Sequence, residues 1–231
     1  MADVRKTSIR RRPSKGTQLV THNVKCVVLG DGDVGKSSML LTFLIGRFPL
    51  ECPPGPMDGH AEFDHLTTTP ATLVHENIEV KMTLVDTYGQ DEYEKLREKV
   101  CKSADVYLLC FDVSKPATLE RLRHTWLPEM RKYSTAETPF LVVGLKTDLR
   151  TIAQADGSDI TKFVTYGDGL KEAADMGSTN YIECSAKNNW AGIKRVLEKA
   201  AQAAVQHSLP ADLKRSSCVV SYSWFFFFFF C

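Results

Sequence analysis

Short apolar runs alternate with longer amphipathic segments along most of the chain. Each run has four to six residues rich in Val, Leu, Ile or aromatic side chains, which is typical of strands buried on both faces of a parallel sheet. The runs are Val24–Leu29, Val80–Val85, Val106–Phe111, Phe140–Gly144 and Tyr181–Cys184. We expect these five segments to form strands.

Three of the intervening segments repeat apolar side chains at helical spacing. The predicted helices are Lys36–Ile45, Thr118–Tyr133 and Asn188–Gln206. Strands that alternate with helices are joined by right-handed crossovers, so that helices cover both faces of the sheet. The pattern therefore predicts an α/β fold.

Two segments interrupt this alternation. Residues 49–62 contain four prolines and two glycines and predict an irregular loop. Residues 151–164 are polar and contain Asp156-Gly157, which predicts a connection that runs over the surface.

Charge is distributed unevenly along the 231 residues. The chain has 29 Lys and Arg against 28 Asp and Glu, but residues 1–20 hold six basic side chains and one acidic side chain. The remaining body is therefore mildly acidic, which argues against a body-wide surface for nucleic acid. The basic start contains Pro13 and Gly16 and predicts a disordered tail, which anionic lipid would attract.

Neither the termini nor the cysteines indicate secretion. The first twenty residues have no continuous apolar stretch, and the longest apolar run, Trp224–Phe230, is far shorter than the ~20 residues of a membrane-spanning helix. The seven cysteines show no metal-ligand spacing, and Cys26, Cys110 and Cys184 lie inside apolar runs. We expect reduced core thiols rather than a zinc or disulfide framework.

A glycine-rich segment with a lysine follows the first predicted strand and leads into the first predicted helix. Residues Gly30–Ser37 read GDGDVGKS and match GxxxxGK[ST], the pattern of phosphate-binding loops. In such a loop, backbone N–H groups surround a phosphate and the following helix N-terminus adds partial positive charge. Lys36 would add a charge at the β/γ-phosphates, and the Ser37 hydroxyl would coordinate Mg²⁺.

The same residues also match GxGxxG, the pattern of dinucleotide-binding folds. Such a fold requires an acidic residue about 20 residues further on, at the end of a second parallel strand. That part of the chain is the Pro-rich segment 49–62, which has no strand pattern. The sequence therefore favours the phosphate-binding loop.

Three further polar segments directly follow predicted strands, at the edge where open α/β sheets bind ligands. They are Asp86–Gln90 (DTYGQ), Leu145–Asp148 (LKTD) and Ser185–Lys187 (SAK). In the first, the Asp86 carboxylate can hold Mg²⁺ through water, the Gly89 N–H can meet a terminal phosphate, and Gln90 can orient an attacking water. Together the four segments predict one nucleotide site.

With these motifs the chain resembles the small GTPases of the Ras superfamily, and among them the Rho branch. The resemblance covers about residues 22–206 and includes GDGDVGKS, DTYGQ (DTAGQ in the family), LKTD and ECSAK. Rho character lies in YEKLR at 93–97, in WLPE at 126–129, and in the 32 residues between Arg150 and Glu183, which leave room for an extra helix. The resemblance implies the P-loop NTPase fold of small GTPases, with a six-stranded, mostly parallel sheet and helices on both faces.

The resemblance also implies how a guanine base is held. Asp148 would accept hydrogen bonds from the ring N–H and amino groups, Lys146 would lie over the base, and Phe48 would pack against its edge. The Ser185–Lys187 segment would close the pocket on the purine oxygen. GTP or GDP is therefore the expected nucleotide.

At the phosphates the resemblance implies a site for Mg²⁺ and a GTP hydrolase that is weak without a partner. Ser37 would bind the ion directly and Asp86 through water, and Gln90 would be the catalytic residue. The expected nucleotide-binding residues are Gly30, Asp31, Gly32, Asp33, Val34, Gly35, Lys36, Ser37, Ser38, Phe48, Asp86, Thr87, Tyr88, Gly89, Gln90, Lys146, Thr147, Asp148, Ser185, Ala186 and Lys187. A partner's arginine can raise the rate of this reaction ~10³–10⁵-fold.

Several positions depart from the family pattern. Asp33 puts a carboxylate into the phosphate loop where the family has Ala or Gly, and its repulsion from a polyphosphate should hasten exchange. Tyr88 replaces a small Ala near the γ-phosphate, so the loop must move or the ring must turn outward. Leu145 replaces an Asn or Thr that braces the pocket, and Leu has no polar atom to do so.

The first switch, residues 49–69, is altered as well. When Phe63-Asp64 is aligned with the family's Phe-Asp, Ala61 stands where the Mg²⁺-binding Thr belongs, and the threonines at 67–69 are candidates to replace it. Two functions therefore stay open. One is a signalling switch that hydrolyses GTP, and the other is a nucleotide-loaded interaction module with fast exchange or little hydrolysis.

The domain plan that we expect is a basic tail at 1–21, a GTP-binding domain at 22–206 and a C-terminal tail at 207–231. In that last tail Cys218–Ser221 matches a C-a-a-X prenylation box, but ten residues follow it. Cys218 would therefore be lipidated only after processing at Ser221. The alternatives are a misplaced stop codon and a Phe-rich end that inserts shallowly at a membrane interface.

The expected partners follow from the same resemblance. They are a guanine-nucleotide exchange factor, a GTPase-activating protein and effectors that bind the switches, with no nucleic acid. We expect a cytoplasmic protein, and the two tails leave open a peripheral position at a membrane surface.

Overall fold

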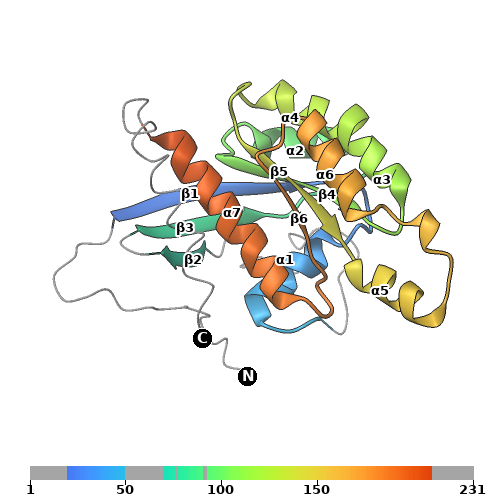
Figure 1. Cartoon of the computed structure of the whole chain (residues 1–231). Coiled ribbons are helices and arrows are strands. Elements are labelled where there is room, and N and C mark those ends of the chain that lie inside the picture. The colour runs from blue at the N-terminus through green and yellow to red at the C-terminus, as the bar shows by residue number, and fades with distance from the viewer. Residues whose placement is uncertain (1–19, 50–69, 76–77, 91–92, 210–231) are drawn as a thin grey trace.

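The apolar runs pair into one six-stranded sheet with the order β2-β3-β1-β4-β5-β6 (Figure 1). The computed structural model describes residues 20–49, 70–75, 78–90 and 93–209. The strands are β1 (Val20–Leu29), β2 (Pro70–His75), β3 (Ile78–Val85), β4 (Val106–Asp112), β5 (Phe140–Leu145) and β6 (Asn180–Glu183). Every neighbouring pair is parallel except β2 and β3, which are antiparallel. This is the fold class that the sequence predicts.

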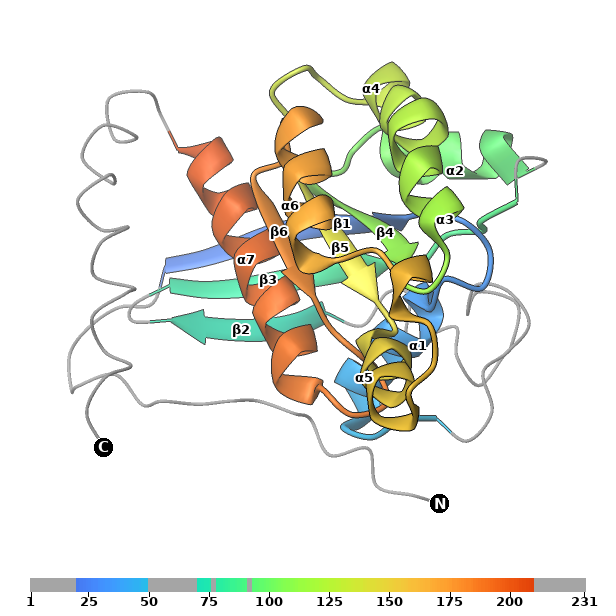
Figure 2. The same ribbon diagram turned by 45° about the vertical axis from the view of Figure 1, so that its right-hand side comes forward.

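Helices cover both faces of this sheet (Figure 2). They are α1 (Lys36–Ile45), α2 (Glu94–Cys101), α3 (Pro116–Arg121), the π-helical turn η3 (Leu122–Trp126), α4 (Leu127–Tyr133), α5 (Thr147–Asp156), the 3₁₀ turn η4 (Ile160–Lys162), α6 (Tyr166–Asp175) and α7 (Trp190–Ser208). Side chains of α1 and α7 share one buried cluster, and those of the α3-η3-α4 stretch and of α6 share the other.

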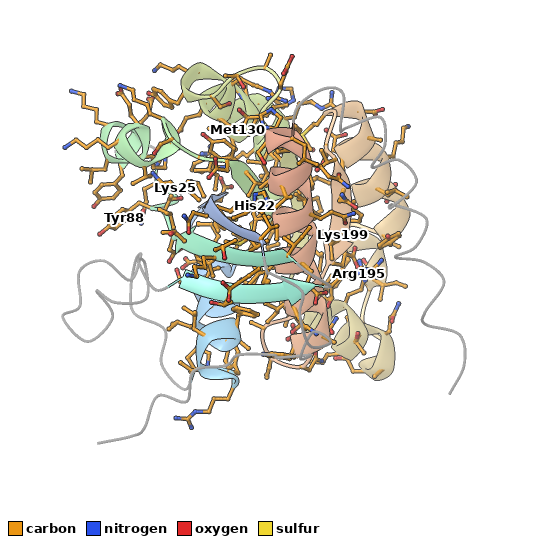
Figure 3. The ribbon with its side chains drawn as sticks, turned by 90° about the vertical axis from the view of Figure 1, so that its left-hand side faces the viewer. His22, Lys25, Tyr88, Met130, Arg195 and Lys199 are labelled. Atoms are coloured by element: carbon orange, nitrogen blue, oxygen red, sulfur yellow. The ribbon has the colours of Figure 1, made fainter. Side chains whose placement is uncertain are left out.

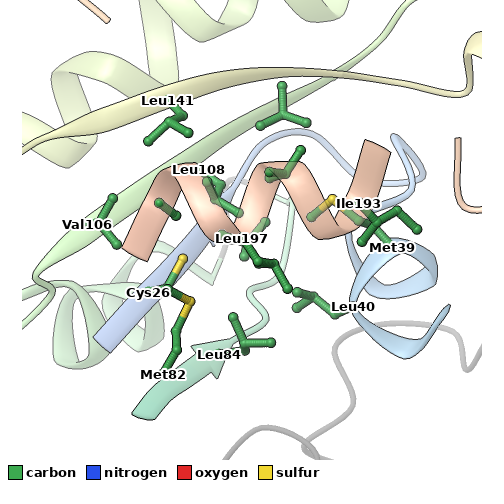
Figure 4. Close-up of a cluster of buried hydrophobic side chains, with 14 of the residues drawn as sticks. Cys26, Met39, Leu40, Met82, Leu84, Val106, Leu108, Leu141, Ile193 and Leu197 are labelled. Atoms are coloured by element: carbon green, nitrogen blue, oxygen red, sulfur yellow. The ribbon is translucent and has the colours of Figure 1, made fainter. Parts of the chain in front are cut away.

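Alternation along β4 shows why the central strands are apolar throughout. Leu108 and Cys110 point into the cluster beneath α1 and α7, whereas Tyr107 and Leu109 point into the other. Successive side chains of a strand face opposite sides of the sheet, so a strand covered twice has no polar face. Figure 4 shows the first cluster, in which Leu197 of α7 lies over the sheet residues.

The five strands predicted from apolar runs are all present, with ends that differ by a few residues. The sixth strand, β2, is an antiparallel strand at the sheet edge and has too short and mixed a pattern to be recognised by itself. The predicted helix over 118–133 is interrupted by η3, where the Leu127 N–H bonds to the Leu122 carbonyl.

The polar connection predicted over 151–164 does run over the surface, since most of its side chains are exposed, but much of it is helical. Helix α5 continues to Asp156, and η4 follows it. Within α5 only Asp148 and Ala153 are buried, so the helix has almost no apolar face from which it could be recognised. It ends at Gly157, whose φ of 76° places it in the left-handed region and whose N–H bonds to the Ala153 carbonyl.

The cysteines that lie in the apolar runs are buried in the core, as the sequence predicts. Cys26, Cys110 and Cys184 are free and buried, as is Cys101. No helix in this part of the chain combines the length and apolar character needed to cross a bilayer. The basic tail at 1–19, the first-switch residues 50–69 with Ala61, and the segment 210–231 with Cys218 lie outside the described residues.

Candidate nucleotide-binding site

The phosphate loop joins β1 to α1 at the edge of the sheet where the parallel strands end. Gly30 has a φ of 144°, and a Cβ there would lie 2.2 Å from the Cys110 carbonyl oxygen. Gly35, with a φ of 107°, directly precedes α1, which has no side-chain cap and no acidic residue in its first turn. The N–H groups at the start of α1 are therefore not satisfied by a side chain and suit a bound anion.

Lys36 closes this loop on itself. Its Nζ donates hydrogen bonds to the carbonyls of Gly30 at 2.8 Å and Asp31 at 2.7 Å. Burial lowers the pKa of Lys36, and the nearby carboxylates of Asp86 and Asp31 act in the opposite direction. The two hydrogen bonds hold the ammonium group at the place where the phosphates would bind.

Ser37 and Asp86 form the expected site for Mg²⁺. The Ser37 hydroxyl donates to Asp86 Oδ2 at 2.5 Å, and the Asp86 side chain is buried. Thr87 fastens the segment after β3 to β1 through a hydrogen bond of 2.6 Å from its hydroxyl to the Val28 carbonyl. Adjacent hydroxyl and carboxylate oxygens are hard ligands that suit Mg²⁺, which commonly takes only one or two protein ligands and fills the rest with phosphate and water.

The described residues hold no group of three or more His, Cys, Asp or Glu side chains that could bind a metal by themselves.

The base would enter a cavity of about 120 Å³ that opens beside the loop. Its lining residues are Gly35, Ser38, Phe48, Leu145, Lys146, Asp148, Leu149, Ala186 and Lys187. The Ser185 hydroxyl donates to Asp148 Oδ1 at 2.6 Å, and the Lys187 N–H donates to Ser185 Oγ at 3.1 Å. These bonds join the segments after β5 and β6 into one wall, as the sequence predicts. Leu149 was missed because an apolar residue in a helix carries no motif.

Lys146 is braced by a residue that the sequence analysis also missed. It has a φ of 62°, and its Nζ donates to the Asp33 carbonyl and lies 2.9 Å from Asp112 Oδ2. Asp112 ends β4 and is only 1% exposed. Leu145 is buried among apolar side chains and gives no polar support, so the Asp112 carboxylate supplies it. The available signal was the position of an Asp at the end of a predicted strand.

The unusual residues of the site adopt distinct positions. Asp33 is exposed and has a φ of 60°. The ring of Tyr88 turns toward Tyr93, with 4.4 Å between the ring centroids, and it lies far from Arg195 and Lys199 of α7 (Figure 3). The Tyr88 ring therefore packs on a side chain of the segment that follows Gln90.

Gly89 and Gln90 lie next to the phosphate loop. A Cβ on Gly89 would lie 2.2 Å from the Gly32 nitrogen, so the two backbones are in contact. The Gln90 side chain is exposed, and the backbone carbonyl of Gln90 accepts a hydrogen bond of 2.5 Å from Arg97 Nη1. All four predicted motifs therefore meet at one edge of the sheet.

A comparison with known protein families matches residues 25–206 to the Ras family. This span includes the phosphate loop, Asp86 and every residue that lines the cavity beside the loop. The chain belongs to the Ras family. Proteins of the Ras family are small GTPases that bind guanine nucleotide, typically with Mg²⁺, and generally hydrolyse GTP. They generally interact with exchange factors, activating proteins and effectors.

Proposed function

We propose that this protein is a Rho-branch GTP/GDP switch that hydrolyses GTP slowly by itself and faster with an activating partner. The base pocket carries the proposal, because Asp148 and Lys146 line a cavity that opens directly beside the phosphate loop. Rho membership is supported by the pairing of the two Rho-like segments, in which Arg97 and Glu129 lie 2.6 Å apart. It is also supported by the helical segments α5 and η4, which precede α6.

One group of residues would hold the guanine base, and another would act at the phosphates. Asp148, held by Ser185, would accept from the guanine N–H and amino groups, which adenine cannot match. Lys36 would exchange its bonds to the loop carbonyls for the phosphates. Ser37 and Asp86 would hold Mg²⁺, which when bound neutralises charge on the phosphate oxygens. Gln90 would orient the water that attacks the terminal phosphorus.

A second candidate function is an interaction module that exchanges nucleotide rapidly and hydrolyses little. Asp33 favours this alternative because its carboxylate belongs to the phosphate loop. Tyr88 favours it too. Its ring packs on Tyr93, and the segment that carries Gln90 could approach a terminal phosphate only while the ring stays there.

Single-turnover GTP hydrolysis of the Gln90→Leu variant separates the two functions. If Gln90 orients the water, the variant should lose on the order of tenfold or more in rate, since a misplacement of about 1 Å can cost roughly 10²-fold. Gln154→Leu is the matched control, because Gln154 is exposed on α5 away from the pocket. Equal rates for the wild type and the Gln90 variant would remove the catalytic assignment and leave the interaction module.

We further propose that nucleotide state is reported through the segments 49–69 and 86–99 to effectors in signal transduction. The cellular position stays a prediction: cytoplasmic, and peripheral at a membrane if Cys218 is lipidated. Mass spectrometry of the C-terminal peptide from cells tests this directly. A prenylated Cys218 supports processing at Ser221, and an intact Phe-rich end rules prenylation out.

A further inference from the structure

Asp31 of the phosphate loop is held from outside the loop. Its Oδ1 accepts hydrogen bonds from Trp126 Nε1 at 2.7 Å and from Arg121 Nε at 2.8 Å. Trp126 is fully buried, and the guanidinium of Arg97 lies 4.8 Å from the centroid of its ring. One indole side chain therefore contacts an anion of the phosphate loop at its edge and a cation from α2 at its face.

Arg97 in turn holds the segment that carries Gln90. Its Nη1 donates to the carbonyls of Tyr88 at 2.9 Å and Gln90 at 2.5 Å, which lie on either side of Gly89. Its Nε and Nη2 donate to the Glu129 carboxylate at 2.6 and 2.8 Å. Arg97 is only 2% exposed, and a buried guanidinium paired in this bidentate way has little freedom to move.

Gly89 completes a ring of contacts. A Cβ on Gly89 would lie 2.3 Å from the Asp31 carbonyl carbon and 2.2 Å from the Gly32 nitrogen. The contacts thus run from Asp31 to Trp126, from Trp126 to Arg97, from Arg97 to both neighbours of Gly89, and from Gly89 back to Asp31. We call this set the positioning ring.

A helical turn with both ends buried carries Trp126 of the positioning ring. Trp126 is the last residue of η3, in which the hydrogen bond from Leu127 N–H to the Leu122 carbonyl encloses one residue more than an α-helical turn. Such π-turns are often found at functional sites. Leu122 and Met130, on either side of Trp126, are fully buried in the second core cluster. The backbone that carries the indole is therefore packed against the core on both sides of Trp126.

We propose that Trp126 and Arg97 are positioning residues that set the spacing between the phosphate loop and the Gln90 segment. This inference rests on the proposed function, because the terminal phosphate of GTP would bind where Gly89 meets the loop. GDP lacks that phosphate. A change in the ring should therefore alter hydrolysis and retention of GTP and leave retention of GDP nearly unchanged.

The test compares Trp126→Phe with Trp190→Phe. Phe keeps an aromatic ring beneath Arg97 but cannot donate to Asp31. Trp190 is the matched control, because its indole N–H has no hydrogen-bond partner among the described residues and its ring packs on Phe43. We expect Trp126→Phe to change single-turnover GTP hydrolysis on the order of tenfold, as loss of a hydrogen bond to a charged group does, with GDP release within twofold of the control.

Two results would contradict the proposed role of Trp126. Equal changes in GTP and GDP release would mean that Trp126 only supports the fold, and rates equal to those of Trp190→Phe would mean that it has no role. A double-mutant cycle with Arg97→Lys gives an independent measure. Either single change already breaks the positioning ring. The double variant should therefore hydrolyse GTP little more slowly than either single variant, and additive effects on the rate contradict the proposal.

Two further measurements keep the ring testable if the first variant or the proposed function fails. If Trp126→Phe does not fold, Arg97→Lys by itself takes its place, since it keeps the charge but cannot bond both to the Glu129 carboxylate and to the carbonyls of Tyr88 and Gln90. If the wild type binds no guanine nucleotide, the proposed function fails by itself. Hydrogen exchange of segments 30–37 and 86–90 is then measured in the nucleotide-free protein. The proposal predicts faster exchange in both segments with Trp126→Phe and in neither segment with Trp190→Phe. Any other pattern contradicts it.

Discussion

Asp33 combines a charge and a backbone conformation that make it unusual for a phosphate loop. Its φ of 60° lies in the left-handed region, which Asn and Asp tolerate better than other residues with a side chain. Its carbonyl accepts the hydrogen bond from Lys146 of the base pocket. The residue therefore fits the loop's shape while its carboxylate opposes the loop's expected ligand.

Asp33→Asn should slow the release of guanine nucleotide, roughly tenfold. The change removes the repulsion between carboxylate and polyphosphate and keeps a side chain that tolerates the left-handed conformation, whereas Ala would add backbone strain. Release of a fluorescent GDP analogue in the presence of Mg²⁺ measures the effect. Glu120→Ala, which removes an exposed acidic side chain from α3, is the control, and an unchanged release rate for Asp33→Asn would refute the repulsion argument.

At the scale of elements, the segment after β3 is shaped by its contact with the phosphate loop. Thr87 ties it to β1, Arg97 holds its carbonyls, and Gly89 touches the loop backbone directly. The last of these contacts leaves no space for a side chain. The segment can therefore be displaced by a single methyl group.

Gly89→Ala should reduce single-turnover GTP hydrolysis more than tenfold while the thermal unfolding midpoint changes by a few degrees at most. The new Cβ would lie 2.2 Å from the Gly32 nitrogen, which forces the Gln90 segment away from the loop. Gly167→Ala on α6 is the matched control, since its Cβ would meet only Thr165 Oγ1 at 3.8 Å. A Gly89 variant that hydrolyses GTP at the wild-type rate would show that the contact is absent in the nucleotide-bound protein.

Elements also differ in how well the sequence predicts them. The central strands are long apolar runs because both of their faces are covered, so pattern alone finds them. Helix α5 has almost no buried face, strand β2 is a short edge strand, and η3 differs from its neighbours only in hydrogen bonding. Their structure depends on neighbours that a local pattern does not contain.

At the scale of the whole molecule, the packing of helices on both faces of the sheet buries the cysteine thiols of the described residues. Burial raises the pKa of Cys26 and of Cys184 to about 12. The pKa of Cys101 also rises to about 12, mainly through burial. A thiol reacts as the thiolate, so we expect these buried groups to react slowly in the folded protein.

At pH 8 the folded protein should therefore resist alkylation by iodoacetamide at Cys26, Cys101 and Cys184, and react there only after denaturation. Unfolded thiols ionise near the ordinary pKa of 9.0 whereas the folded ones do not. Their contribution to stability is therefore fully present below about pH 9 and declines from there towards pH 12. Mass spectrometry of alkylated peptides with and without denaturant checks this, and labelling of Cys26 in the native protein at the denatured rate would contradict it.

The sequence by itself determined the α/β fold, the phosphate loop and most of the residues that line the cavity beside that loop. These features are encoded locally, in apolar periodicity and in motifs that directly follow strands. The tertiary structure alone decided which side chains brace those motifs. Asp112 beneath Lys146, and Trp126 between Asp31 and Arg97, are far from their partners along the chain. Only the packing of the sheet against its helices brings them together, because contacts of this kind depend on long-range geometry and leave no local signal.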